Sequence, residues 1–120
     1  MNPTNNTLVN LVVEGIREKK GHRISIVDLR SIETAPCEYF VVATGNSPQQ
    51  VEAMTESVED VVREKGKEKP AAVAGLDNAY WVAMDYGEVL VHVFLPEARQ
   101  HYDLEHLWAD AKLTEIADLD

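Results

Sequence analysis

Aromatic and acidic side chains alternate through residues 80–108, and this pattern is the most distinctive chemical feature of the sequence. The aromatic residues there are Tyr80, Trp81, Tyr86, Phe94, Tyr102 and Trp108, and the interleaved carboxylates are Asp85, Glu88, Asp103 and Glu105. Trp and Tyr are favoured anchors of protein interfaces, and carboxylates steer a basic partner toward them. Core packing explains the same aromatic residues equally well. The pattern therefore predicts either a core, or a docking patch for a basic protein, or both.

The segment Gly45-Asn46-Ser47 comes where a strand is predicted to turn into a helix. Backbone amides at a helix N-terminus are able to hold phosphate. However, the sequence lacks the G-x-x-x-x-G-K-[ST] and G-x-G-x-x-G spacings. The predicted strands also lack the acid-x-acid pair that metal-dependent nucleotide transfer needs. Helix capping by Ser47 is the favoured interpretation, and phosphate binding is the alternative.

No metal site, cofactor or catalytic residue is expected. The pairs His101/Glu105 and His106/Asp110 are spaced four apart, but neither follows the H-E-x-x-H pattern. Cys37 has no basic neighbour in the sequence to lower its pKa, which indicates an inert or structural thiol.

Charge narrows the possible partners. Eleven Lys and Arg face 21 Asp and Glu, which gives a net charge of −10. Such a chain is repelled by phosphate backbones and anionic lipid, so direct binding to nucleic acid or a membrane is not expected. A single cysteine excludes an internal disulfide and fits a reducing compartment. Because no signal peptide or long apolar run is visible, the sequence predicts a soluble cytoplasmic protein.

Residues 1–120 are expected to form one domain with a mixed sheet. The pattern predicts a first helix in which Gly15 marks a close approach, and a strand over 23–29 with Ser25 and Asp28 facing outward. It further predicts a central strand over 39–44, a helix opening at Pro48, an edge strand over 72–74, and a hairpin over 80–94. A helical turn from Pro96, a helical stripe over 104–111 capped by Asp103, and a frayed acidic tail from about 112 complete the chain. These elements imply an α/β fold with a sheet of about five strands flanked by helices.

Three long blocks are similar to the ribosomal silencing factor family, also called Iojap-like. They are residues 39–47 (YFVVATGNS), 81–94 (WVAMDYGEVLVHVF) and 99–111 (RQHYDLEHLWADA), within a resemblance that runs from about Leu8 to Ala111. The resemblance implies a fold akin to nucleotidyltransferases without their catalytic carboxylates, and a non-enzymatic role. It also implies binding to large-subunit ribosomal protein fourteen at the intersubunit face, which would block small-subunit joining and repress translation. Assembly of the large subunit and homodimer formation occur among members.

The family's interface signature falls on nine residues of this chain: Trp81, Asp85, Tyr86, His92, Phe94, Arg99, Tyr102, Leu104 and Glu105. The resemblance implies that Trp81, Tyr86 and Tyr102 anchor the partner. It also implies that Asp85 and Glu105 face basic side chains, while Leu104 packs either at the surface or in the core. The chain departs from the family where Ala74 replaces a common Glu, His101 a common Phe and Gln49 a frequent Arg.

The sequence thus predicts a ribosome-binding factor that prevents subunit association. Two alternatives stay open, a large-subunit assembly factor and a nucleotide-binding enzyme that uses the turn at residues 45–47. Joining assays, the maturity of the bound particles and stabilisation by nucleotide would discriminate among them.

Overall fold

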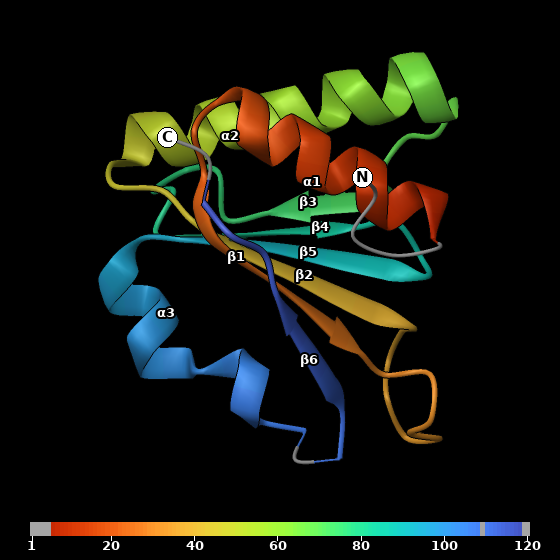
Figure 1. The fold of residues 1–120 in the computed structure, drawn as a ribbon. Helices are drawn as coiled ribbons and strands as arrows, with labels where there is room; N and C mark the ends of the chain where they lie inside the picture. Colours follow the sequence, from red (N-terminus) through yellow and green to blue (C-terminus); the bar gives the residue numbers. More distant parts are fainter. Residues whose placement is uncertain (1–5, 109, 119–120) are drawn as a thin grey trace.

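The computed structural model describes residues 6–108 and 110–118, which form a six-stranded mixed sheet flanked by helices (Figure 1). The strands are β1 (His22–Asp28), β2 (Tyr39–Thr44), β3 (Ala72–Ala74), β4 (Trp81–Asp85), β5 (Val89–Phe94) and β6 (Lys112–Glu115). The helices are α1 (Thr7–Glu18), α2 (Pro48–Val61) and α3 (Pro96–Tyr102), with a π-helical turn η1 (Val62–Gly66) and a 3-10 turn η2 (Leu104–His106).

The strand order is β3-β4-β5-β2-β1-β6. β2 and β5 pair in parallel, and the other neighbours pair antiparallel. This order confirms the α/β mixed sheet, with six strands where about five were expected. It also confirms the central position of β2, whose six residues are all buried.

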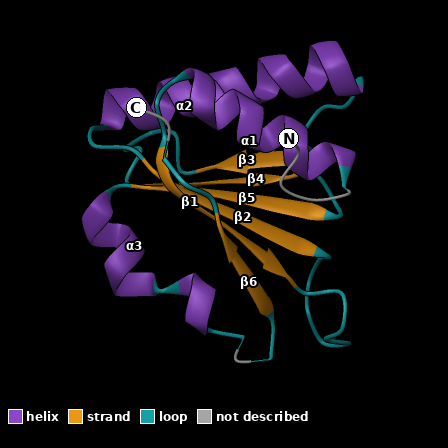
Figure 2. Cartoon of the chain, in the orientation of Figure 1, coloured by secondary structure: helices purple, strands orange, loops and turns teal. Residues whose placement is uncertain are grey.

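The two faces of the sheet are covered differently (Figure 2). α1 and α2 lie together over one face, where their apolar residues form a core cluster with alternate positions of β1, β2, β4 and β5. α3 and η2 lie on the other side, over a smaller cluster that includes Phe40, Phe94 and Ala98. We call the second side the open face, because the shorter helical segment leaves part of it uncovered. Its positions in the β4–β5 hairpin are Trp81, Ala83, Asp85, Leu90, His92 and Phe94.

Local sequence signals at the start of α2 are confirmed. The Ser47 hydroxyl accepts a hydrogen bond from the backbone N–H of Gln50 at 3.1 Å, and Pro48 is the first helical residue. The Gln50 side chain accepts from the backbone N–H of Asn46 and donates to the carbonyls of Lys19 and Lys20. The cap of α2 is therefore also a tie to the end of α1.

The close approach predicted at Gly15 is confirmed. A Cβ built on Gly15 would lie 2.7 Å from the Cα of Val58, which is closer than side chains pack. The Ser57 hydroxyl uses this proximity to donate to the carbonyl oxygen of Gly15 at 2.7 Å. Only a residue without a side chain allows α1 and α2 to meet at this point.

Three expectations about local structure are wrong. Ser25 does not face solvent but is 2% exposed, because α3 and η2 cover that face of β1. Of residues 104–111, the described ones contain only the short turn η2, and Asp103 does not act as the expected cap, because its backbone is left-handed (φ 45°, ψ 52°) and not extended, and its side chain makes no capping hydrogen bond. The tail is not frayed from residue 112, because β6 pairs with β1 and Asp118 accepts from the backbone N–H of Arg23. Residues 119–120 of that tail lie outside the described part.

Candidate functional site

Four of the nine signature residues form one aromatic cluster on the open face. β4 supplies Trp81, β5 supplies His92 and Phe94, and α3 supplies Tyr102. The Trp81 ring lies 5.2 Å from that of Phe94, its cross-strand partner, and 4.6 Å from that of Tyr102, measured between centroids. Such distances are typical of favourable aromatic pairs. The strand register and the end of α3 thus bring together residues up to 21 positions apart in the printed sequence.

His92 fixes the orientation of the Trp81 ring. The indole N–H of Trp81 donates to Nδ1 of His92 at 3.0 Å, so the His92 proton resides on Nε2. His92 is 4% exposed and packs edge-on against Phe40. Burial lowers the pKa of His92 from its usual 6.5 to about 4, which keeps the ring neutral and able to accept.

The surface part of this cluster is apolar and partly exposed. Tyr102 is 43% exposed, Trp81 beside it is half-buried, and Ala83 and Leu90, farther along the same face of the hairpin, are half-buried too. We call Trp81, Ala83, Asp85, Leu90 and Tyr102 the docking face. Leu104 is also half-buried and packs against the cluster beneath. An apolar surface of this kind with a carboxylate beside it suits protein docking.

Asp85 and Tyr86 lie on opposite sides of the sheet, because side chains alternate along a strand. Asp85 is exposed on the open face, and its carboxylate accepts from the backbone N–H of Gly87 at 2.8 Å. Tyr86 is 7% exposed in the core cluster under α1 and α2, where burial raises the pKa of its hydroxyl to about 12. The interpretation of Tyr86 as an anchor beside Trp81 is therefore corrected.

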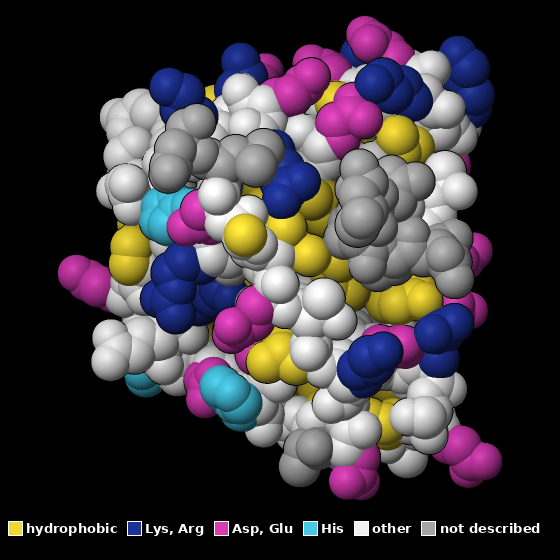
Figure 3. Space-filling model, viewed as in Figure 1, with side chains coloured by type: hydrophobic (Ala, Val, Ile, Leu, Met, Phe, Trp, Pro, Cys, Tyr) yellow, Lys and Arg dark blue, Asp and Glu magenta, His cyan; other side chains and the backbone are white. Residues whose placement is uncertain are grey.

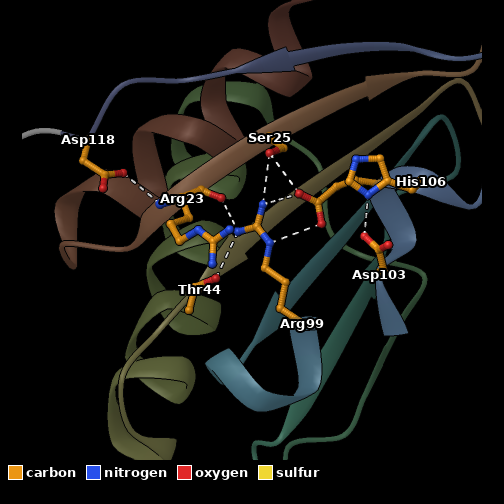
Figure 4. Close-up of polar contacts among 8 residues, drawn as sticks. Arg23, Ser25, Thr44, Arg99, Asp103, His106 and Asp118 are labelled. Carbon is orange, nitrogen blue, oxygen red and sulfur yellow. Dashed lines mark hydrogen bonds and ion pairs between the residues drawn. The ribbon is translucent and has the colours of Figure 1, made fainter. Parts of the chain in front are cut away.

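Arg99 pairs with Glu105 inside the protein, and Figure 4 shows that the Arg99 side chain also points toward Ser25 and Thr44. The Arg99 guanidinium donates to both carboxylate oxygens of Glu105, at 2.6 and 3.2 Å, and the two side chains are 5% and 10% exposed. It also donates to the hydroxyls of Ser25 and Thr44, each at 3.0 Å, and to the carbonyl of Arg23. Glu105 therefore neutralises an internal cation, which corrects the expectation that it faces a partner's basic side chain.

Sequence reasoning did not identify Arg23, Ser25 and Thr44 as partners of Arg99. No local sequence pattern identifies these three residues as partners, because they precede Arg99 by 55 to 76 positions. It also missed Phe40, which belonged to a run interpreted only as a buried strand. In both cases the fold creates the site, and only tertiary contacts identify its members.

The turn at residues 45–47 uses its polar groups internally. The backbone N–H of Asn46 binds the Gln50 side chain at 2.7 Å, and the Ser47 hydroxyl binds the Gln50 backbone at 3.1 Å. A Cβ on Gly45 would lie 3.1 Å from side-chain atoms of both Val51 and Met54. These contacts favour capping and tight packing over the phosphate alternative.

Other chemistry is limited in the part of the chain that the structure describes. Cys37 is half-buried, its thiol donates to the carbonyl of Tyr39, and burial raises its pKa. Over the described residues, no three His, Cys, Asp or Glu side chains group in a way that would hold a metal ion. None of the described helices is both long and apolar enough to span a bilayer.

These features define a small mixed-sheet α/β domain whose distinctive surface is an open aromatic face next to acidic residues. The family model described as "Ribosomal silencing factor during starvation" matches residues 2–120. The chain belongs to this ribosomal silencing factor family.

Individual relatives agree with that placement. The ribosomal silencing factor of Halalkalibacterium halodurans is 34% identical over 94% of this chain and 95% of its own length. A mouse protein named "Mitochondrial assembly of ribosomal large subunit protein 1" is 28% identical over 91% of this chain and 50% of its own length. A crystal structure of a protein from Chromobacterium violaceum superposes with a TM-score of 0.80 at 34% identity, covering 92% of this chain and 90% of that chain.

Proposed function

We propose that this protein binds the large ribosomal subunit through the docking face and sterically blocks joining of the small subunit, which represses translation in the cytoplasm. The partner is large-subunit ribosomal protein fourteen, which offers basic side chains at the intersubunit face. The mechanism is occupancy of space, so the role is non-enzymatic and involves no cofactor. Membership of the ribosomal silencing factor family supports this proposal.

One observation carries the choice of surface. The aromatic docking face comes from the strongly acidic C-terminal part of the chain, since the 50 residues 71–120 contain ten Asp and Glu against two Lys and Arg. One of those two cations, Arg99, is buried against Glu105. A basic partner is therefore attracted to this part and finds aromatic anchors there.

Burial of the nine signature residues supports a division of their roles in this proposal. Trp81, Asp85, Tyr102 and Leu104 are exposed or half-buried and make the contacts. The enclosed residues His92, Phe94, Arg99 and Glu105 support the surface from within, whereas Tyr86 belongs to the core on the other side of the sheet.

The test is sedimentation of the protein with salt-washed large subunits, before and after small subunits are added. We expect the protein to travel with the large subunit and the joined-ribosome peak to fall. If the protein stays at the top of the gradient, ribosome binding is wrong for this chain. If it binds without reducing joining, the blocking mechanism is wrong.

The Trp81→Ala variant tests the surface in the same assay. Loss of a central aromatic anchor should weaken binding by at least about 2 kcal/mol. Tyr80→Ala is the matched control, because Tyr80 is a neighbouring aromatic residue, 37% exposed, that precedes the strand. A folded Trp81→Ala variant that binds like the wild type would remove Trp81 from the interface.

A large-subunit assembly factor is the second candidate, favoured by the name of the mouse relative. The same docking face would then act on precursor particles. Separation of cell extracts into immature and mature large subunits tests this function, which predicts that the protein is enriched on the immature fraction. Homodimer formation stays a prediction, to be tested by light scattering of the free protein.

A further inference from the structure

We propose that the Arg99–Glu105 ion pair is a positioning device that holds Tyr102 against Trp81 and so presets the docking face for its partner. The inference rests on the proposed function, because it assigns a role to two signature residues that the fold encloses. Neither side chain needs to contact the partner in this role.

The pair closes a sharp bend in the chain. Arg99 lies within α3, Glu105 lies in η2, and between them the chain turns at Asp103 in a left-handed conformation. The Arg99 guanidinium meanwhile reaches Ser25 and the Arg23 carbonyl on β1 and Thr44 on β2. The bend is therefore attached to two strands of the sheet through one side chain (Figure 4).

Apart from Ala98, which is fully buried in the cluster beneath α3, the segment that carries Tyr102 is attached mainly by half-buried side chains. α3 has seven residues and η2 has three, and neither has a side-chain cap. Leu107 is 65% exposed, and the Asp103–His106 contact lies on the surface, with both side chains more than half exposed. Half-buried Leu104 and Trp108 add packing against the sheet. The ion pair is thus the buried polar tie that sets where α3 ends.

The position of Tyr102 follows directly from that tie. Tyr102 is the last residue of α3 and lies three residues from both Arg99 and Glu105. Its ring lies 4.6 Å from Trp81 and 6.3 Å from Phe94. An anchor held in its bound arrangement loses less conformational freedom on binding.

Stability alone explains such a pair poorly. Removing two charges from water is costly, and apolar replacements of a buried ion pair are often neutral or stabilising. If the Arg99–Glu105 pair fixes the position of Tyr102, in contrast, apolar replacements of the two residues do not reproduce its role. This difference separates positioning from a merely structural role.

The experiment compares Arg99→Met/Glu105→Leu with the wild type by urea unfolding, by affinity for salt-washed large subunits, and by the NMR resonance of the Trp81 indole N–H. We expect the double variant to stay folded and to bind at least tenfold more weakly. The indole resonance should shift toward its position in Tyr102→Ala, which removes the neighbouring ring. Either wild-type affinity of the folded double variant or an unshifted resonance would overturn the proposal.

Glu105→Gln provides a second variant that keeps the size of the side chain, in case the double variant does not fold. Gln still accepts from Arg99 but lacks the charge, so we expect a smaller shift of the indole resonance and a smaller loss of affinity. An unchanged resonance in this variant would contradict the proposal if the double variant is unfolded.

The readouts also separate this inference from the proposed function. If Trp81→Ala binds as tightly as the wild type, the docking face is wrong, while the indole resonance still reports whether the ion pair positions Tyr102. If Trp81→Ala weakens binding but the folded double variant does not, the function stands and the positioning role fails.

Discussion

Trp81 shows how one residue is prepared for binding by its neighbours. Its indole N–H, the one polar group of the side chain, is bonded to His92 within the protein. The half-buried ring therefore offers an apolar surface without an unpaired donor that a partner would have to satisfy. His92, which the sequence presented as one more signature residue, acts at this site as the acceptor that sets the ring's direction.

The His92 acceptor predicts a pH dependence of stability. Above about pH 6.5 the residue is neutral in both the folded and the unfolded chain and contributes no pH dependence. Below that pH the unfolded chain takes up a proton, whereas the folded chain, with the His92 pKa at about 4, does not. The free energy of unfolding should therefore decrease as pH falls from about 6.5 toward 4, by up to roughly 3 kcal/mol.

Urea unfolding of the wild type and of His92→Gln at several pH values between 7 and 4 measures this contribution. Gln accepts hydrogen bonds but does not titrate, so the difference between the two proteins isolates His92 from the exposed histidines. Parallel pH profiles for the two proteins would show that His92 does not resist protonation in the folded state.

At the scale of elements, the sequence predicts helices and strands that have a local signal better than it predicts which face of a strand is covered. The central strand, the capped start of α2 and the β4–β5 hairpin were predicted, because each has a local signal in apolar runs, a Ser-Pro start or a glycine turn. The prediction that Ser25 faces solvent was wrong, because it assumed that one face of the alternating strand is exposed. α3 and η2 cover that face, and the hydroxyl binds Arg99 and Glu105 there.

Alternation of side chains and tertiary contacts also explain why Tyr86, one of three expected anchors, and Glu105, one of two expected acidic contacts, were misplaced. The resemblance implied that Trp81 and Tyr86 anchor the same partner, but they are five residues apart, and such an odd separation puts their side chains on opposite faces of the sheet. In the sequence, Arg99 and Glu105 are six residues apart and resemble two independent surface charges. The left-handed bend at Asp103 brings them together, and the sequence interpretation missed it because Asp103 was taken as a helix cap, although Asp adopts this conformation more readily than most residues.

The junction of α1 and α2 predicts a large effect from a small substitution. Gly15→Ala should destabilise the protein by about 1–3 kcal/mol, although Ala favours helix formation, because the added carbon would meet the Val58 backbone at 2.7 Å. Chemical unfolding measures the change. Gly66→Ala is the matched control, since the nearest atom there is the flexible end of Leu11 at 2.9 Å, and it should cost less. Equal costs would show that the helices do not meet at Gly15.

Packing of the C-terminal segment against the core leads to a second prediction about the free energy of unfolding. Ile116 follows β6, packs against the main core cluster, and its backbone N–H donates to the carbonyl of Ile24 at 2.8 Å. Ile116→Ala should therefore cost roughly 1–2 kcal/mol, below the range for fully buried positions. Leu113→Ala, at a position 36% exposed, should cost less in the same unfolding assay. No loss from either variant would restore the expectation of a frayed tail.

For the whole molecule, the net charge is distributed unevenly along the chain. Of the net −10, residues 71–120 contribute −8, and this part supplies β3–β5, α3 and β6. The space-filling view in Figure 3 shows acidic and basic side chains mixed over the surface that includes the helix layer. A carboxylate that lies on the docking face itself, such as that of Asp85, orients a long-range encounter without adding affinity at every contact, because electrostatic steering acts mainly on the association rate.

Asp85→Lys tests whether that steering acts at the docking face. The substitution changes the net charge by two units beside Trp81 and should slow association with large subunits most strongly at low salt, where screening is weakest. Glu52→Lys makes the same change in net charge on the exposed side of α2, across the sheet from the docking face. Association rates measured over a range of ionic strengths compare the two variants. If both slow association equally, only the overall charge matters. A slower rate for Asp85→Lys alone would place the encounter on the open face, because charge at that location and not the total then decides the rate.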